Sequence, residues 1–67
     1  MSKWYVSWEY AEWLDKHSVL WHEGDTTIEA FDLRRAIFVG MWHCIDDMTD
    51  TAVAVRNFTV EEEKENA

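Results

Sequence analysis

Aromatic residues constrain the fold of this chain more than any other feature. Five tryptophans, two tyrosines and three phenylalanines occur in only 67 residues. A chain of this length buries only about 60% of the surface that it exposes when unfolded, so one small core cannot hold all ten rings. Because the centres of protein interfaces are enriched in Trp and Tyr, we expect some of these rings to contact a partner. The sequence therefore favours a binding function.

The chain is also strongly acidic, with a formal net charge of −8. Its hydrophobic fraction of 48% is too high for a disordered chain, so we expect one folded domain. Nucleic acid and anionic lipid are bound through Lys and Arg, and an acidic surface repels them. We therefore expect a basic protein as the partner, with no direct binding of nucleic acid or membrane. The alternative is that acidity only keeps an aromatic-rich domain soluble.

Cysteine content and the start of the chain bear on the compartment. Cys44 is the single cysteine and has no internal disulfide partner, which favours a reducing compartment. The first residues contain no apolar run typical of a signal peptide, and no segment approaches the roughly 18 apolar residues of a membrane span. We expect a cytoplasmic protein.

Hydrophobic alternation predicts a β-hairpin at the start of the chain. Residues 3–13 alternate with a period of two, which is typical of a strand. One side of this strand carries Trp4, Val6, Trp8 and Tyr10. Residues 15–18 are polar and turn-like, and residues 19–22 are again β-prone, so the two segments form a hairpin.

Residues 26–31 fit two structures. Gly24 and its acidic neighbours are expected to end the second strand. Thr26 with Glu29 then matches a capping box, which would start a helix. The same residues also alternate like a strand, with Ile28 and Ala30 on one face. We favour a short third strand that ends before Asp32.

A helix is predicted from Asp32 to Asp47, with Asp32 as its N-cap. Its apolar positions recur at steps of three and four, which is typical of a helix facing a core. These positions are Leu33, Ala36, Ile37, Gly40, Met41, Cys44 and Met48. A glycine inside such a helix costs about 1 kcal/mol relative to alanine, so Gly40 indicates close approach of a sheet or a ring.

Residues 51–60 alternate again and predict a final strand, with Phe58 and Arg56 on the same side. Residues 1–60 are then a single domain, and residues 61–67 an acidic flexible tail. The order of elements predicts an α+β fold, a small antiparallel sheet with one helix packed on one face. We expect the other face to be open and to carry several rings of the hairpin.

The sequence shows no catalytic or metal-binding motif. The two glycines, Gly24 and Gly40, are too few for a phosphate-binding loop. The four candidate zinc ligands lack the spacing of a closed zinc site, and Cys44 falls on the apolar stripe; they are His17, His22, His43 and Cys44. We therefore predict a non-enzymatic protein without a cofactor or a metal.

Two groups of carboxylates are candidate partner-binding residues. Anions are unfavourable at the C-terminal end of a helix, so the acidic trio at that end marks a candidate site, with local turn capping as the alternative. The second group lies on or beside the hairpin, where rows of carboxylates can imitate a nucleic-acid backbone. The two groups are Asp46, Asp47 and Asp50, and Glu9, Glu12, Asp15, Glu23 and Asp25. The candidate apolar anchors are Trp8, Trp13 and Trp21.

In size, charge and element order the chain resembles the small acidic proteins with which phages disable host enzymes. Inhibitors of bacterial RNA polymerase and of uracil-DNA glycosylase are examples, and several are DNA mimics. The segment of residues 28–36, a strand that runs into a capped helix, is the nearest local likeness. The resemblance implies phage origin and inhibition of a nucleic-acid-processing host enzyme through its basic surface. The alternative is a self-associating structural or regulatory module, a homodimer formed through an aromatic sheet face.

Overall fold

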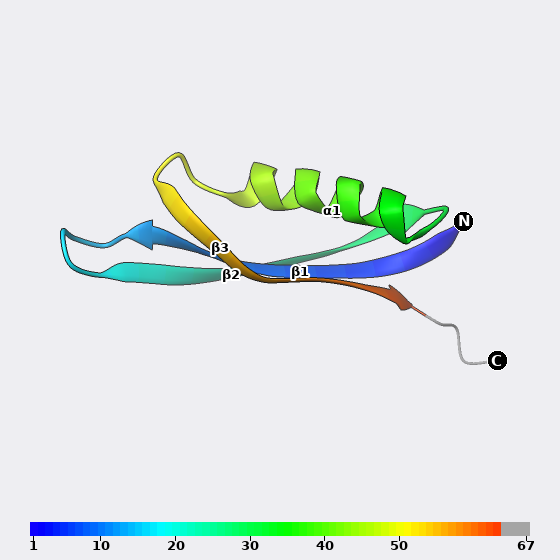
Figure 1. Cartoon of the computed structure of the whole chain (residues 1–67), viewed down its shortest axis with the longest axis horizontal. Coiled ribbons are helices and arrows are strands. Elements are labelled where there is room, and N and C mark those ends of the chain that lie inside the picture. Colours follow the sequence, from blue (N-terminus) through cyan, green and yellow to red (C-terminus); the bar gives the residue numbers. More distant parts are fainter. Residues whose placement is uncertain (64–67) are drawn as a thin grey trace.

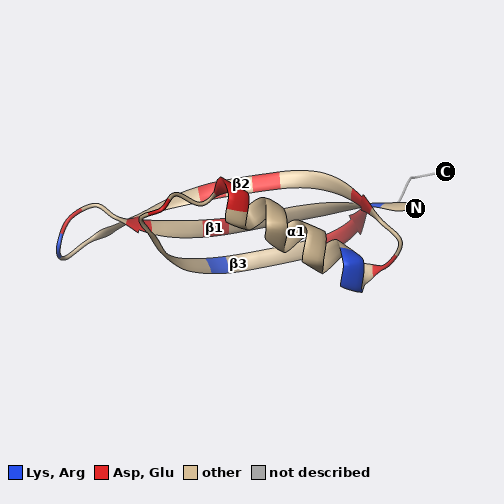
Figure 2. Cartoon of the chain, turned by 90° about the horizontal axis from the view of Figure 1, so that it is seen from above, with Lys and Arg blue, Asp and Glu red and all other residues tan. Residues whose placement is uncertain are grey.

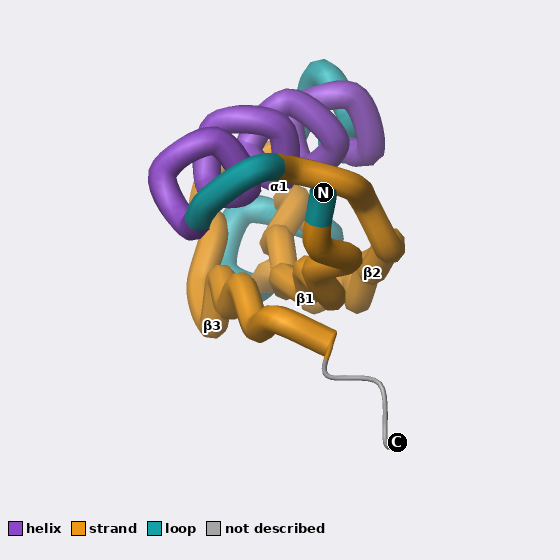
Figure 3. The backbone as a smooth tube through the Cα atoms, turned by 90° about the vertical axis from the view of Figure 1, so that its right-hand side faces the viewer, coloured by secondary structure: helices purple, strands orange, loops and turns teal. Residues whose placement is uncertain are grey.

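The computed structural model describes residues 1–63, which form three strands and one helix (Figure 1). The elements are β1 (Ser2–Trp13), β2 (Val19–Ala30), α1 (Leu33–Asp47) and β3 (Ala52–Glu63). The strands form one antiparallel sheet in the order β2-β1-β3. Figure 3 shows α1 on one side of the sheet, and none of the helices and strands of residues 1–63 covers the other side. The predicted α+β fold is confirmed.

β1 and β2 form a long hairpin, paired from Trp13 opposite Val19 to Ser2 opposite Ala30. The prediction that Gly24 ends the second strand is wrong, because β2 runs through it to Ala30 without a break. Gly24 lies opposite Trp8, and a side chain there would overlap the Trp8 indole and the Asp47 carboxylate. The glycine makes room for the ring. Residues 26–30 accordingly belong to β2 and start neither a helix nor a separate strand.

The core lies between α1 and the face of β1 that carries Trp4, Val6, Trp8 and Tyr10, all of which are buried. Both buried tryptophans have hydrogen-bond partners for their indole N–H groups, as buried Trp requires. The Nε1 of Trp4 donates to the carbonyl of Ala30 at 3.1 Å, and the Nε1 of Trp8 donates to Oδ2 of Asp47 at 3.0 Å. The indoles thus tie β1 to β2 and to α1.

α1 begins after Asp32, whose Oδ1 accepts the backbone N–H of Arg35 at 2.9 Å. The predicted close approach at Gly40 is confirmed, because a Cβ there would lie 2.9 Å from Cγ1 of Val6. The helix packs on the sheet through small residues, Ala36, Gly40 and Cys44. The prediction was wrong about two larger members of the stripe: Leu33 is 50% exposed and Met41 is 45% exposed.

β3 departs from the predicted alternation at a bulge. Its pairing with β1 shifts between Ser7 and Glu9, where Asn57 adopts a left-handed backbone with φ of 53°. Asn accepts this conformation more readily than most residues. As a result Phe58 faces α1 whereas Arg56 faces the open side, although the alternation placed them together.

The predicted acidic tail begins too early. Residues 61–63 continue β3, with Glu61 opposite Tyr5 and Glu63 opposite Lys3. Residues 64–67 lie outside the described part of the chain. The domain therefore extends at least three residues beyond the predicted boundary at residue 60.

Candidate partner-binding surface

The uncovered face of the sheet is acidic. It also carries Tyr5 and Trp21, so the expectation that rings of the hairpin lie on this face is confirmed in part. Because opposite residues of paired strands share a face, the register assigns its members. Within residues 1–63 the face carries six carboxylates and two cations: Glu9, Glu23, Asp25, Glu29, Glu61 and Glu63, with Lys3 and Arg56. We call it the acidic face. Figure 2 shows red segments on all three strands.

A hollow of about 450 Å³ opens on the acidic face between β1, β2 and β3. Its lining includes Tyr5, Glu9, Glu23, Asp25 and Asn57. Glu9 and Glu23 lie directly opposite each other, a cross-strand arrangement of like charges that destabilises a sheet. A site that retains such a pair is suited to a positively charged ligand group.

The raised pKa of Tyr5 reflects its hydrogen bond to Asp25 and the negative charge around this hollow. Its hydroxyl donates to Oδ2 of Asp25 at 3.0 Å. This hydrogen bond is the main reason why the pKa of Tyr5 is raised, and the charges of Asp25, Glu23 and Glu61 add to the effect. All three strands therefore contribute charge to the same place.

Glu9 is the best-held carboxylate of the face. The side-chain amide of Asn57 donates to its Oε2, and Arg56 approaches its two oxygens at 3.4 Å. The hydrogen bond from Asn57, followed by that from Arg56, lowers the pKa of Glu9. The guanidinium of Arg56 also stacks 3.7 Å from the centre of the Trp21 ring. One of the two cations of the face is thus already engaged.

Sequence reasoning missed Glu29, Glu61 and Glu63 as members of this surface. Lys3 lies opposite Glu29 on one side and Glu63 on the other. Glu29 lies an even number of residues from Glu23 and Asp25, so it shares their face if all three belong to one strand. The expected strand break at Gly24 hid this relation. Glu61 and Glu63 were assigned to the tail.

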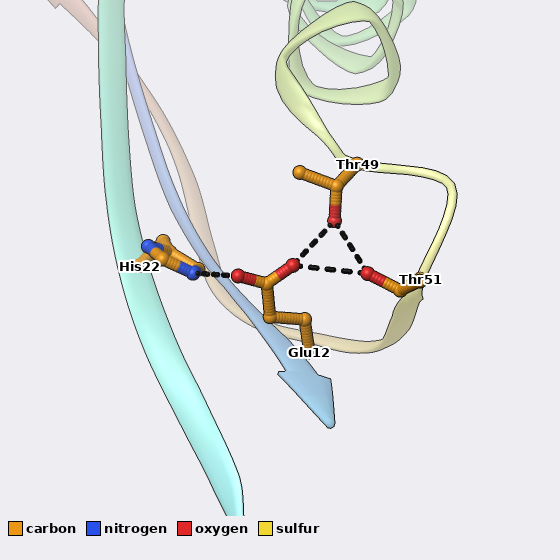
Figure 4. A network of polar contacts seen from close by, with 4 residues as sticks. All are labelled: Glu12, His22, Thr49 and Thr51. Carbon is orange, nitrogen blue, oxygen red and sulfur yellow. Dashed lines mark hydrogen bonds and ion pairs between the residues drawn. The ribbon is translucent and has the colours of Figure 1, made fainter. Parts of the chain in front are cut away.

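Glu12 and Asp15 have structural roles away from the acidic face. Oε2 of Glu12 accepts the hydroxyls of Thr49 and Thr51 at 2.9 and 3.0 Å, and Oε1 lies 2.7 Å from Nε2 of His22 (Figure 4). The bond to His22 is the main cause of the lowered pKa of Glu12. Oδ1 of Asp15 accepts the backbone N–H groups of His17 and Ser18 in the hairpin turn. Glu12 is thus engaged through both of its oxygens, whereas Asp15 uses one oxygen in the turn and lies exposed.

The acidic trio after the helix does not act as one site. All three are exposed, but Asp47 accepts the indole N–H of Trp8, whereas Asp46 and Asp50 make no hydrogen bond through their side chains within residues 1–63. The trio therefore divides into one carboxylate bonded to a core indole and two without such a bond.

The three candidate anchors differ in exposure. Trp8 is 4% exposed, so it is part of the core and the prediction of a binding role for it is wrong. Trp13 is 56% exposed at the end of β1 and stands next to Leu14, Val19 and Leu20, which are also exposed. Trp21 is half-buried beneath Arg56. Trp13 is the ring available at the edge of the acidic face.

Within residues 1–63 no group of three or more His, Cys, Asp or Glu side chains is arranged to hold a metal ion. Cys44 is buried, and this burial is the main cause of its raised pKa. No helix among these residues is long and apolar enough to cross a membrane. Comparison with protein-family models, with curated proteins and with solved structures gave no match to this chain.

Proposed function

We propose that this chain is a non-enzymatic binding protein that inhibits a nucleic-acid-processing protein by occupying its basic surface. The observation that carries the proposal is the acidic face, on which three strands present six carboxylates and two cations. Carboxylates two residues apart on a strand are about 7 Å apart, so the sheet presents negative charge in regular rows. A surface that binds nucleic acid offers Lys and Arg to such rows.

The acidic face supports steering as well as pairing. A concave acidic surface focuses the field and raises the rate of association with a basic protein. Trp13 at the hairpin end supplies an apolar contact beside the charges. α1 covers Trp4, Trp8 and Tyr10, whereas Tyr5 lies among carboxylates on the acidic face. Two copies of that face would place like charges together, which disfavours the aromatic homodimer that was the alternative.

Capture from a bacterial lysate tests this function, with the bound proteins eluted by duplex DNA. Three immobilised chains are compared: wild type, Glu23→Gln/Asp25→Asn, and the control Asp50→Asn/Glu62→Gln. Both variants lose two charges, one from an Asp and one from a Glu, but only the first alters the acidic face. We expect wild type and control to retain the same DNA-eluted proteins and the face variant to lose them. Equal retention by all three chains, or proteins that DNA does not displace, would contradict the proposal.

A further inference from the structure

The outward side of α1 is apolar through its middle. Phe38, Trp42 and Ile45 are 57%, 68% and 57% exposed. They are four and three residues apart, so they form one stripe that points away from the sheet. An aromatic side chain can bury about 150–250 Å², so each of these two rings leaves about 100 Å² in water. Contiguous exposed apolar surface of this kind marks an interaction site.

The stripe continues into a groove of about 390 Å³ between α1 and β3. Every lining residue is hydrophobic: Met41, Cys44, Ile45, Met48, Val55 and Phe58. Ile45 borders both the stripe and the groove. A stable interface buries about 800 Å² on each partner, and one helical stripe alone supplies less than this. Stripe and groove together form a broader surface, which we call the apolar face.

Residues of opposite charge flank the two ends of the stripe. Arg34 lies one turn before Phe38, and Asp46 lies one turn after Trp42. Figure 2 shows the basic N-terminal turn and the acidic C-terminal turn of α1. Both charges oppose the dipole of their own helix, which favours anions at the first turn and cations at the last. Within residues 1–63 neither side chain makes an ion pair or a hydrogen bond.

These positions are symmetric about Gly40, since residues 34 and 46 are equally far from it and so are residues 38 and 42. A two-fold axis that crosses the outward side of α1 at the level of Gly40 would place two copies of α1 antiparallel, while Gly40 itself faces the sheet. Arg34 would then lie opposite Asp46 of the partner subunit, and Phe38 would lie opposite the partner's Trp42. Arg34 would also lie beside the C-terminal end of the neighbouring helix, where a cation is favoured, and Asp46 would lie beside its N-terminal end, where an anion is favoured.

We propose that the apolar face binds a second copy of this chain, with α1 packed antiparallel on α1. A two-fold interface must be complementary to itself, and the charge order of the stripe meets this requirement. The net charge of −8 per copy does not prevent the pairing. Because α1 covers the opposite side of the sheet, the two acidic faces point outward in this dimer. Two packed helices, whose axes are about 8–10 Å apart, lie between the two sheets, so the faces are farther apart than the roughly 8 Å over which physiological salt screens charge. The dimer is independent of the proposed inhibitory function.

Sedimentation over a dilution series tests the dimer through charge reversal. Wild type should sediment at twice its 8.0 kDa mass at the higher concentrations. Arg34→Asp and Asp46→Arg each place like charges at both ends of the interface, and we expect each to weaken self-association by about tenfold or more. An equimolar mixture restores both opposite-charge pairs in a heterodimer, so mixing the two variants should restore the dimer.

Paired tryptophan variants separate the apolar face from other exposed rings. Trp42→Ala should abolish the dimer at concentrations where wild type is dimeric, whereas Trp13→Ala, at an exposed ring of the hairpin end, should leave it intact. Circular dichroism checks that each variant is folded. A wild type that is monomeric throughout the series overturns the proposal. So does a dimer that neither charge reversal weakens, or a mixture that associates no better than its components.

Discussion

The acidic face and the apolar face lie on opposite sides of one thin domain and have opposite chemistry. The sheet leaves six carboxylates in the open, whereas α1 exposes Phe38, Trp42 and Ile45. The chain is elongated, with principal extents of 50 × 20 × 13 Å, and buries few side chains fully. A domain this small cannot bury all of its aromatic rings. The open face of its sheet carries charged side chains, and the outward side of its helix carries exposed apolar side chains. Each face is then suited to a different partner.

The largest expected effect separates a core tryptophan from a surface one. Trp8→Ala removes a buried ring and its hydrogen bond to Asp47, and we expect it to lower the free energy of unfolding by about 3–5 kcal/mol. Trp42→Ala, measured in dilute protein, should change it by less than about 0.5 kcal/mol. Urea unfolding followed by circular dichroism measures both. Similar losses for the two variants would show that α1 packs on the sheet through its outward side.

A smaller effect is expected where α1 touches the sheet. Gly40→Ala gains about 1 kcal/mol of helix propensity. Its Cβ would lie 2.9 Å from the fully buried Val6, and crowding of this kind costs about 1–3 kcal/mol. We expect a net loss of about 1 kcal/mol in urea unfolding, whereas His43→Ala on the exposed side of the helix should be neutral within about 0.5 kcal/mol. A Gly40→Ala variant more stable than wild type would place the helix farther from β1.

Acid should weaken the contact between the loop after α1 and the sheet. Because the pKa of Glu12 is lowered in the fold, its contribution to stability is complete above its unfolded pKa of about 4.3 and is lost as the pH falls through the folded value. Glu12→Gln should lower the melting temperature at pH 7 and make its fall at acid pH shallower. Glu62→Gln, at an exposed position without a side-chain hydrogen bond within residues 1–63, is the control. Identical pH profiles for the two variants would remove Glu12 from this role.

The smallest effect concerns the acidic face itself. Glu23→Gln ends the like-charge contact with Glu9 across the strands, so the melting temperature should rise slightly. Calorimetry at low salt measures the change, which should shrink as salt screens the pair. A marked fall would show that Glu23 stabilises the fold and is not held ready for a partner.

Local patterns predicted the elements well. The alternation of residues 3–13 and the capped helix from Asp32 both appear in the structure, and so does the close approach at Gly40. Gly24 misled the prediction because sequence alone does not show the ring of Trp8 that lies opposite it. The bulge at Asn57 likewise depends on pairing with β1, which no local pattern in residues 51–60 specifies.

The candidate site was predicted less well because charge placement depends on register. Five of the eight predicted carboxylates lie away from the acidic face, and Glu12 and Asp47 among them bond to core or loop residues. The face acquires Glu61 and Glu63 only when β3 pairs with β1. The sequence also did not determine which rings stay exposed. Trp8 and Trp21 were both candidate anchors, but Trp8 faces α1 and Trp21 faces the open side of the sheet.

The salt dependence of partner binding tests the role of the acidic face most directly. The measurement is the slope of the logarithm of Kd against the logarithm of salt concentration, for a protein captured by the chain and eluted with DNA. If the face pairs with basic groups, Glu23→Gln/Asp25→Asn should give a shallower slope than wild type, and Asp50→Asn/Glu62→Gln should retain the wild-type slope. Equal slopes for the two variants would contradict the account, because binding would then follow total charge and not the acidic face.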